Sequence, residues 1–393
     1  MEIDIHRCIL SVVERCCMIY KTGSLTEFVK EIKNDVYCFG AGRVFTSFLD
    51  MFAHFKLETY IKAVVDNNSK ITGSFKKVAN GANIPIISLQ QMLNDIKPND
   101  CILITTIAYE EVIDQLERIE KLKDITFYIY SILSIEQHDF ELSRITVPKQ
   151  LSTCQELQIP KVIHYCWFGR QQIPNQYKKW MESWKYYCPD YEIIEWNEDN
   201  YDVHKNKYSS QAYEKKKWAF VSDYARIDIV NEYGGVYLDT DVELIKNIDI
   251  LLMNEAFCSF ETIQYVNYGL GFGAKKNNSI LSELKEYYSS ANFILEKGKL
   301  DQTPCPIIQT EVMKRHELKC NGEFQVVDGM TVYPSSVLCG MSPYSFRVKK
   351  DLKDSYAIHH YAGSWVEGRS GKESIISRMK RWSKNDNYIY FEE

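Results

Sequence analysis

Short apolar runs alternate with amphipathic segments through the first third of the chain. The runs at 36–39, 61–65 and 101–106 are typical of buried strands. Apolar residues recur at helical spacing over 44–55, directly after the Gly40-Ala41-Gly42 turn. Strands that alternate with helices predict a parallel sheet with right-handed crossovers. We therefore expect a small Rossmann-like parallel-sheet domain of the α/β class.

The chain of 393 residues is too long for one ordinary core, so a second domain is expected. A polar stretch punctuated by Pro148 and Pro160 precedes a new apolar strand at 160–165. We expect the Rossmann-like domain over residues 1–145, a linker over 146–159 and a larger domain over 160–393.

The glycine turn invites a dinucleotide-binding interpretation, because such a turn lets backbone N–H groups approach a pyrophosphate. The pattern Gly40-x-Gly42-x-x-Thr46 departs from the full fingerprint, although Asp66 lies near the distance at which an acidic residue would meet a ribose. Two interpretations stay open: a cofactor site, or a Rossmann-like scaffold that binds no redox cofactor.

The second half contains a long segment that lacks Gly and Pro. It spans Glu214 to Tyr233 and ends at Gly234-Gly235, which predicts one helix. Asp223 and Arg226 lie three apart and therefore share one face of this helix. On its own, such a pair is as well explained by an ordinary salt bridge as by a binding site.

The segment after this helix changes that balance. A short apolar strand at 235–238 delivers Asp239 and Asp241 at its carboxyl end. Residues two apart in an extended segment face the same side, so both carboxylates can point at one site. Two like charges held this close repel unless a cation or another positive group lies between them. A hard divalent cation meets this need, because Mg²⁺ or Mn²⁺ takes carboxylate oxygens together with substrate phosphates. The pattern predicts a metal site that acts on a diphosphate.

The spacing of Ser222-Asp223-x-x-Arg226 and of Tyr233 to Asp241 resembles the DXD-containing glycosyltransferases. That family groups yeast initiating mannosyltransferases, bacterial capsule sugar transferases and the glucosylating large clostridial toxins. The resemblance covers roughly residues 160 to 370. It implies a GT-A fold, a nucleotide-sugar donor, a manganese-type cofactor and transfer with retention of anomeric configuration.

The resemblance also implies roles for single residues. Asp223 and Arg226 would lie against the donor sugar and its phosphates. Asp239 would contact the ribose, the sugar and the metal, and Asp241 would ligate the metal directly. Tyr237 matches an aromatic residue beside the leaving diphosphate.

Two other segments extend the resemblance on the donor and acceptor sides. Residues 160–169 are similar to the opening strand of the family, in which a Trp, here Trp167, stacks on the nucleotide base. His164 on this strand is expected to be structural. The glycine-rich loop 267–274 is interpreted equally well as an ordinary turn or as a loop that shapes the acceptor side, with Asn267 as a candidate sugar contact.

Residues 356–365 resemble the closing motif of the family. A histidine here would either complete the metal shell, which favours Mn²⁺ over Mg²⁺, or bind the diphosphate together with Ser364. His359 and His360 alternate in direction on a strand, so at most one faces the site. We expect His360 to face it; the alternative is that both histidines only pack or form hydrogen bonds. Ser364 would bind the diphosphate and Trp365 would close over the donor.

Three segments of the first domain, 39–43, 65–68 and 84–88, resemble accessory domains attached to enzymes of capsule and cell-surface polysaccharide synthesis. The resemblance leaves the ligand of this domain open.

Charge and cysteine content exclude several classes of protein. The net charge of −6 leaves no global basic surface for nucleic acid. The twelve cysteines have no metal-ligand or disulfide spacing, and no run approaches the ~20 apolar residues of a membrane span. The first residues lack the pattern of a secretory leader. A reducing, cytoplasmic location is therefore expected.

These observations predict a metal-dependent, retaining hexosyltransferase. It would use Mn²⁺ or Mg²⁺ and transfer a hexose from a UDP-sugar to a glycan or lipid-linked acceptor in capsular polysaccharide synthesis. Peripheral contact with the inner membrane surface through Lys215 to Lys217 or through 378–384 is an alternative to simple solvation of these lysines and arginines. Two other functions remain: an N-terminal cofactor-dependent sugar-modifying enzyme, and a non-catalytic carbohydrate-binding protein.

Overall fold

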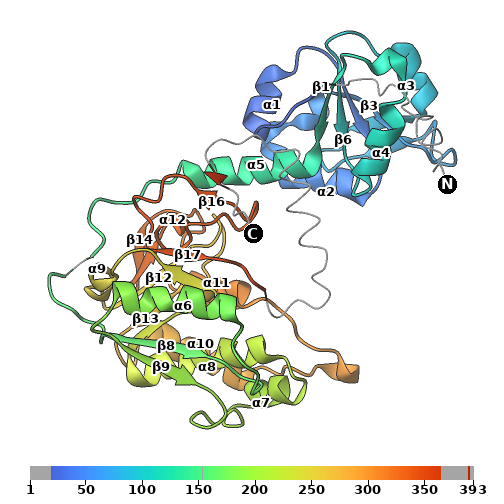
Figure 1. Ribbon diagram of the computed structural model, residues 1–393. Coiled ribbons are helices and arrows are strands. Elements are labelled where there is room, and N and C mark those ends of the chain that lie inside the picture. The colour runs from blue at the N-terminus through green and yellow to red at the C-terminus, as the bar shows by residue number, and fades with distance from the viewer. Residues whose placement is uncertain (1–18, 153, 364–387, 390–393) are drawn as a thin grey trace, which may run out of the picture. The chain divides into compact units, whose positions relative to one another are not determined.

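The computed structural model describes residues 19–152, 154–363 and 388–389. The chain divides into two compact units, with the division between Phe140 and Glu141. Each unit contains its own seven-stranded sheet (Figure 1). The α/β class is confirmed in both. The division falls inside a helix, α5, which begins at Tyr130 in the first unit and ends at Ser143 in the second.

The first unit is a doubly wound sheet. Its strands are β1 (Ile19–Tyr20), β2 (Val36–Phe39), β3 (Ile61–Val65), β4 (Phe75–Lys77), β5 (Asn83–Ile87), β6 (Cys101–Ile104) and β7 (Thr126–Ile129). Its helices are α1 (Leu25–Glu31), α2 (Arg43–Met51), α3 (Leu89–Asp95), α4 (Tyr109–Leu116) and α5 (Tyr130–Ser143), with 3-10 turns η2 (Ala53–Phe55), η3 (Leu57–Thr59) and η4 (Glu120–Leu122). The order is β1-β7-β6-β2-β3-β5-β4, and all neighbours are parallel except β4 and β5.

Apolar side chains cover both faces of this sheet, which explains why its central strands are apolar runs without alternation. Phe28 of α1 and Phe45 of α2 pack in the cluster on one face. Met92 of α3 and Val112 of α4 pack in the cluster on the other. The predicted helix over 44–55 is shorter than expected, because α2 ends at Met51 and a 3-10 turn follows.

The second unit is built on a mixed sheet. Its strands are β8 (Val162–Cys166), β9 (Glu192–Trp196), β10 (Gly235–Tyr237), β11 (Val242–Leu244), β12 (Ala256–Ser259), β13 (Phe272–Ala274), β14 (Gln325–Val327), β15 (Met330–Tyr333), β16 (Val348–Lys349), β17 (Ala357–His359) and β18 (Tyr388–Ile389). Its helices are α6 (Asn175–Tyr187), α7 (Lys207–Glu214), α8 (Trp218–Tyr233), α9 (Asp249–Leu252), α10 (Ser279–Ser290), α11 (Cys305–Lys314) and α12 (Ser335–Leu338), with 3-10 turns η5 (Tyr268–Leu270) and η6 (Glu296–Gly298).

The main sheet of this unit has the order β14-β15-β12-β13-β10-β8-β9. Strand β13 is antiparallel to both β10 and β12, whereas β8 and β9 continue parallel to β10. Strands β11 and β17 form a separate antiparallel pair. The second unit is therefore a mixed sheet with helices packed on both faces, in agreement with the α/β class expected for this domain.

Helix α8 is the central helix of the second unit, and most of its residues are buried. The predicted helix over 214–233 is wrong in one respect. Helix α7 ends at Glu214, the lysines 215–217 connect it to α8, and Lys216 adopts a left-handed conformation with φ of 56°. That conformation interrupts a right-handed helix, and it therefore separates the two helices.

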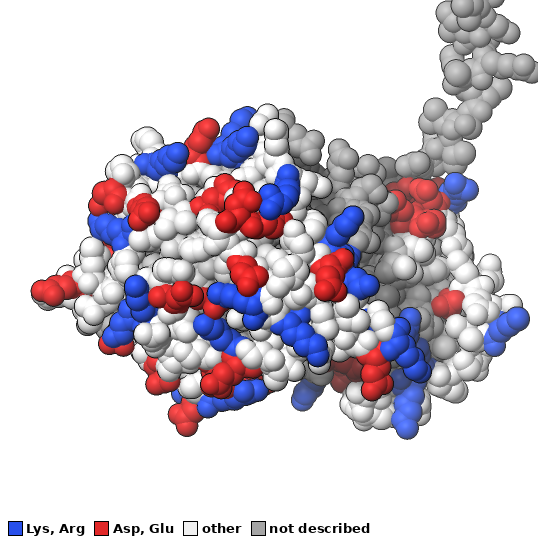
Figure 2. Space-filling model, turned by 90° about the horizontal axis from the view of Figure 1, so that it is seen from below, with Lys and Arg blue, Asp and Glu red and all other residues white. Residues whose placement is uncertain are grey.

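Residues 144–161 contain no helix or strand where the structure describes them. Val147 and Leu151 of this segment pack against the core of the second unit. On the face of the molecule in Figure 2, Lys and Arg side chains are interspersed with Asp and Glu side chains. No helix within the described ranges has the length and apolar character that crossing a membrane requires.

Candidate active site

The turn after β10 brings Asp239 and Asp241 to the carboxyl end of the sheet. Gly234 precedes this strand and Gly235 begins it, and both have positive φ values, 70° at Gly234 and 106° at Gly235. A Cβ atom at Gly235 would lie 2.8 Å from the carbonyl oxygen of Val162 on the neighbouring strand. The close pairing of β10 with β8 therefore requires glycine at this position.

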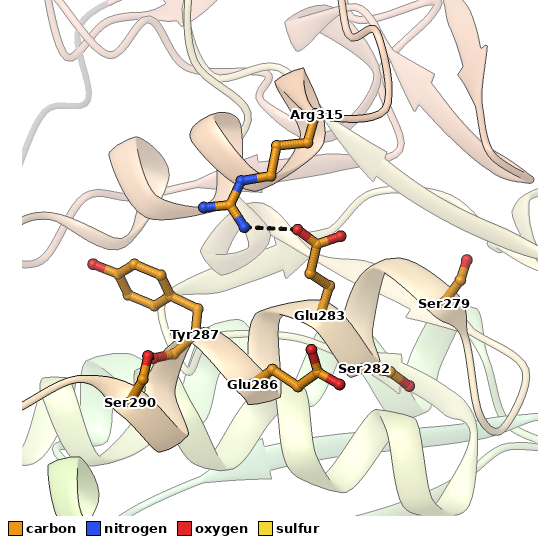
Figure 3. Close-up of a pocket in the computed structure, with 7 residues that line it drawn as sticks. All are labelled: Ser279, Ser282, Glu283, Glu286, Tyr287, Ser290 and Arg315. Carbon is orange, nitrogen blue, oxygen red and sulfur yellow. Dashed lines mark hydrogen bonds and ion pairs between the residues drawn. The ribbon is translucent and has the colours of Figure 1, made fainter.

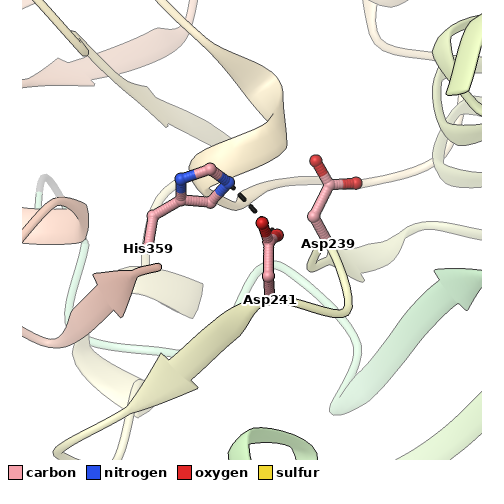
Figure 4. A group of neighbouring side chains, drawn as sticks. All are labelled: Asp239, Asp241 and His359. Carbon is pink, nitrogen blue, oxygen red and sulfur yellow. Dashed lines mark ion pairs between the residues drawn. The ribbon is translucent and has the colours of Figure 1, made fainter. Parts of the chain in front are cut away.

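A histidine from β17 lies beside the two carboxylates. Ligand atoms of Asp239, Asp241 and His359 all lie within 4.8 Å of one another (Figure 4). The Nε2 atom of His359 is 3.3 Å from an oxygen of Asp241, and the buried Nδ1 atom has no hydrogen-bond partner. Two carboxylates and an imidazole are a donor set that fits a divalent cation such as Mn²⁺.

The prediction that His360 faces this site is wrong. The ring of His360 stacks on Trp180, with centroids 4.2 Å apart, and its Nε2 contacts a carboxylate oxygen of Glu243 at 2.8 Å. His359 is the last residue of β17, where its backbone pairs with Val242, immediately after Asp241. Alternation along the strand therefore directs the side chain of His359, and not that of His360, toward the Asp pair.

The ionisable side chains of this group shift one another's pKa values. Burial alone would raise the pKa of Asp241, but the nearby charge and hydrogen bond of His359 hold that pKa well below its usual range. Burial opposes protonation of His359, yet Asp241 raises the pKa of this imidazole above its ordinary value. Burial raises the pKa of Asp239, and Arg226 opposes the increase.

Arg226 of α8 joins the helix to the Asp pair. Its Nη2 lies 3.0 Å from Asp223, its Nη1 lies 3.4 Å from Asp239, and its Nε donates to the carbonyl oxygen of Ser222. The guanidinium also lies 5.1 Å from the centroid of the Tyr237 ring. Because only 5% of its side chain is exposed, Arg226 is a buried cation that orients two carboxylates.

Asp223 lies beside this cation, with 9% of its side chain exposed. Burial raises the pKa of Asp223 to about 6, against the opposing charge of Arg226 and a hydrogen bond from Cys305. Cys305 begins α11, far from Asp223 in sequence. The sequence carried no signal for this thiol, because the contact depends on how α11 packs against α8.

Tyr237 lies in the core beneath the Asp pair. Only 1% of the residue is exposed, and its hydroxyl donates to Asp239 at 3.0 Å. Because Tyr237 is buried, its hydroxyl is fixed in place and holds the Asp239 carboxylate from the core side.

Asn267 and Gly269 adjoin the Asp pair on its other side. The side-chain oxygen of Asn267 accepts a hydrogen bond from the backbone N–H of Gly269 at 2.7 Å. A Cβ atom at Gly269 would lie 2.5 Å from Asp239 and 3.2 Å from Arg226. The structure therefore brings Asn267 close to the Asp pair, together with Gly269, a residue of the loop 267–274 that sequence reasoning did not single out.

Trp167 follows β8 at the same edge of the sheet. Its indole N–H donates to the carbonyl oxygen of Gln171, and its ring contacts Tyr177 edge to face. His164 on β8 is structural: its Nε2 contacts the carbonyl oxygen of Gly234, and its Nδ1 accepts from Trp196. Ser364 and Trp365 lie outside the described residues.

In the first unit, the backbone of the glycine turn at residues 40–42 forms a hydrogen bond with the side chain of Asp66. Asp66 accepts hydrogen bonds from the backbone N–H of Ala41 at 2.9 Å and from that of Asn68 at 2.9 Å. Both carboxylate oxygens of Asp66 thus have backbone partners within the domain.

A surface hollow on α10 contains none of the predicted site residues (Figure 3). Its lining residues are Ser279, Ser282, Glu283, Glu286, Tyr287, Ser290 and Arg315. The Arg315 guanidinium already pairs with Glu283 at 2.8 Å. The chemistry-bearing residues therefore gather at the carboxyl edge of the second sheet, and not in this hollow.

Comparison with known proteins relates this part of the chain to glycosyltransferases. Residues 174–258 match the family described as "Glycosyltransferase sugar-binding region containing DXD motif". The chain is 23% identical over 222 residues to an uncharacterized glycosyltransferase of Acanthamoeba polyphaga mimivirus, covering 53% of this chain and 84% of that one.

A fission-yeast relative is also similar. Inositol phosphoceramide mannosyltransferase 1 of Schizosaccharomyces pombe is 32% identical over 142 residues, which is 33% of this chain and 43% of that protein. The chain thus spans less than half of the length of that relative. Among solved structures, PaToxG glycosyltransferase aligns over 47% of this chain and 76% of that one, with 17% identity and a TM-score of 0.30.

The matched region contains Asp223, Arg226, Asp239 and Asp241, the same residues that meet at the sheet edge. The chain therefore carries, over residues 174–258, a region that matches the sugar-binding region of DXD-containing glycosyltransferases.

Proposed function

We propose that the protein transfers a hexose from a nucleoside diphosphate sugar, most simply a UDP-sugar, to a hydroxyl of a glycan or lipid-linked acceptor. The observation that carries this proposal is the group of Asp239, Asp241 and His359, with ligand atoms within 4.8 Å of one another. Such a group suits a divalent cation that binds a diphosphate. Synthesis of a surface polysaccharide such as a capsule is the proposed setting.

The metal site would be held by Asp241 and His359, with Asp239 as the third group. Mn²⁺ is the proposed ion because a histidine nitrogen is a better ligand for Mn²⁺ than for Mg²⁺. When bound, a divalent cation supplies positive charge next to the leaving diphosphate. Asp241 keeps its carboxylate ionised in the fold, as its lowered pKa indicates, so the site retains a metal-binding charge over a wide pH range.

Donor-binding roles are proposed for residues at the same edge. Trp167 would stack on the base, and Asp223 would accept hydrogen bonds from hydroxyls of the sugar. Arg226 would orient Asp223 and Asp239, which it contacts at 3.0 Å and 3.4 Å, and offset negative charge during departure of the diphosphate. Ser364 and Trp365 would complete the donor site from the closing segment.

Retention of anomeric configuration is proposed through a front-face reaction. The bond between the anomeric carbon and the diphosphate oxygen breaks, and a bond to the acceptor oxygen forms on the same face. The proton of the acceptor hydroxyl passes to the leaving diphosphate oxygen. The ion-paired Asp223 suits binding of the sugar better than nucleophilic attack.

The test is release of a nucleoside diphosphate from a panel of nucleotide sugars, measured with Mn²⁺ and without an acceptor. Hydrolysis should require the metal, and it should be lost on chelation and in Asp241→Ala. Donor hydrolysis that survives both changes would rule out the metal role. The location of the protein, including contact with a membrane surface, is a separate question that cell fractionation answers.

A further inference from the structure

The carboxyl ends of several strands meet at the edge that holds the Asp pair. Strand β8 is parallel to β10, and β13 is antiparallel to both β10 and β12, so β8, β10 and β12 run in one direction. Trp167 follows β8, the Asp pair follows β10, and Glu261 follows β12. The order β8-β10-β13-β12 places Glu261 on the side of the Asp pair opposite to Trp167.

The strand order predicts how a ligand would lie along this edge of the sheet. Ligands of α/β sheets bind outside the carboxyl ends of the strands. If the nucleotide base lies at the end of β8 and the diphosphate at the end of β10, the sugar and its acceptor lie toward β12. Glu261 is the carboxylate that the chain places there.

Glu261 is held by a closed hairpin. Its backbone N–H donates to the carbonyl oxygen of Tyr265 at 2.8 Å, and Phe260 pairs with Val266 just inside the turn. Its carboxylate accepts a hydrogen bond from the side-chain amide of Asn267 at 3.0 Å. The hairpin therefore fixes the distance between Glu261 and Asn267 before any ligand binds.

The Asn267 amide is oriented from both ends. Its oxygen accepts from the N–H of Gly269 at 2.7 Å, while its Nδ2 donates to Glu261. Gly269 in turn lies against Asp239. A side-chain amide has two N–H donors, so this arrangement leaves one Nδ2 proton of Asn267 for a ligand.

We propose that Glu261 is a positioning residue on the sugar side of the site, which holds the Asn267 amide so that its remaining N–H binds a hydroxyl of the transferred sugar. This proposal rests on the proposed sugar transfer at Asp239 and Asp241. Glu261 itself contacts neither the nucleotide nor the metal in this scheme. Its loss should affect the sugar step and spare binding of the nucleoside diphosphate.

The test compares Glu261→Ala with Glu261→Gln. Loss of the hydrogen bond in Glu261→Ala should lower kcat for sugar transfer or donor hydrolysis about 10- to 100-fold. Glu261→Gln keeps an acceptor oxygen opposite Asn267 and should restore most of that rate. The Kd of UDP with Mn²⁺, measured by calorimetry, should stay within about twofold of wild type in both variants.

Glu255→Ala is the matched control, because Glu255 precedes the same strand at its opposite end and pairs with the exposed Lys275. It should leave kcat unchanged. A fourth variant combines Glu261→Gln with Asn267→Asp, so that the donor and the acceptor of this hydrogen bond are exchanged. Its melting temperature should match that of wild type. Its rate of sugar transfer should stay low, because Asp offers no N–H to the sugar.

Three results would overturn the assignment. An unchanged rate in Glu261→Ala excludes any role, and equal damage in Glu261→Gln shows that the charge, and not the hydrogen bond, matters. Weakened binding of UDP in Glu261→Ala shows a general structural role. By contrast, absence of UDP and Mn²⁺ binding in the wild-type protein contradicts the proposed function itself, and the two failures are thereby distinguished.

Discussion

The imidazole of His359 meets the carboxylate of Asp241 across the β11–β17 pair, with Nε2 and Oδ1 3.3 Å apart. Two further contacts hold the same aspartate against the closing segment. The backbone N–H of His360 donates to its carbonyl oxygen, and that of Ala362 donates to its carboxylate at 2.8 Å. Residues 360–362 are therefore attached to Asp241, the proposed metal ligand, and their geometry depends on the register of these two strands.

His359→Ala should weaken binding of Mn²⁺ by more than about tenfold, because a ligand is removed. His360→Ala is the neighbouring control, since this ring contacts Glu243 and Trp180. Calorimetry or manganese electron paramagnetic resonance measures both affinities. A larger loss in His360→Ala than in His359→Ala would reverse the assignment.

Metal binding should also depend on pH through His359. Asp241 raises the pKa of this imidazole in the fold, and only the neutral form ligates a metal. The affinity for Mn²⁺ should therefore increase as the pH rises through that raised pKa, with release of a proton. In His359→Ala, this part of the pH dependence should disappear.

Protonation of Asp223 should lower kcat/KM at acidic pH. Burial raises its folded-state pKa to about 6, above the value of about 3.9 expected in an unfolded chain. Its protonated form is the one favoured in the fold, so its contribution to stability is present at low pH and is lost as the pH rises toward 6. Sugar binding needs the ionised form, so kcat/KM should fall below about pH 6.

The check is a pH profile of kcat/KM for donor hydrolysis in wild type and in Asp223→Asn. The variant should be much less active, and its remaining activity should lack the limb near pH 6. A limb that persists in Asp223→Asn must come from another group.

Gly269→Ala should abolish most activity without unfolding the protein. The added Cβ would lie 2.5 Å from Asp239 and 3.0 Å from Asn267, so these two site residues must move. A displacement of about 1 Å in a catalytic group costs on the order of 100-fold in rate. Gly42→Ala is the matched control, because a Cβ atom there has nothing within 4 Å; its rate and melting temperature should match wild type.

Asp228→Ala should destabilise the second unit. This carboxylate is 3% exposed, accepts a hydrogen bond from Tyr201 at 3.0 Å and pairs with Lys285 at 2.8 Å and with Lys205. Removing a buried partner leaves unpaired groups, and we expect a loss of about 2 to 4 kcal/mol in the free energy of unfolding. Urea denaturation measures it.

Glu232→Ala provides the comparison for Asp228. Glu232 is half exposed and lies 3.9 Å from Lys205, so its loss should change stability by less than about 0.5 kcal/mol. Equal effects of the two substitutions would mean that burial of Asp228 does not contribute as argued.

The local sequence pattern predicted much of the fold and about half of the candidate site. The strands β2 and β3 lie where apolar runs predicted them, because a buried parallel strand needs an apolar side chain on both faces. Asp239 and Asp241 do lie together, as their spacing predicted. They lie in the turn between β10 and β11, where the backbone N–H of Val242 donates to the carbonyl oxygen of Asp239, and not in the extended segment that the prediction assumed. Asp223 and Arg226 pair because residues three apart share a helix face.

Other features depend on contacts between segments that are distant in sequence. The break at Lys216 separates two helices that composition alone joined, since nothing in the lysine run signals a left-handed residue. Cys305 reaches Asp223 only through the packing of α11, and Glu261 reaches Asn267 only through the hairpin that follows β12.

The sequence by itself indicated the Asp pair, the pairing of Asp223 with Arg226 and the α/β class, because each could be inferred from the spacing of residues along the chain. The choice between His359 and His360 was decided by tertiary structure alone. A shift of one residue in the pairing of β17 with β11 would exchange the two rings, and register is set by packing across the sheet and not by the two histidines themselves.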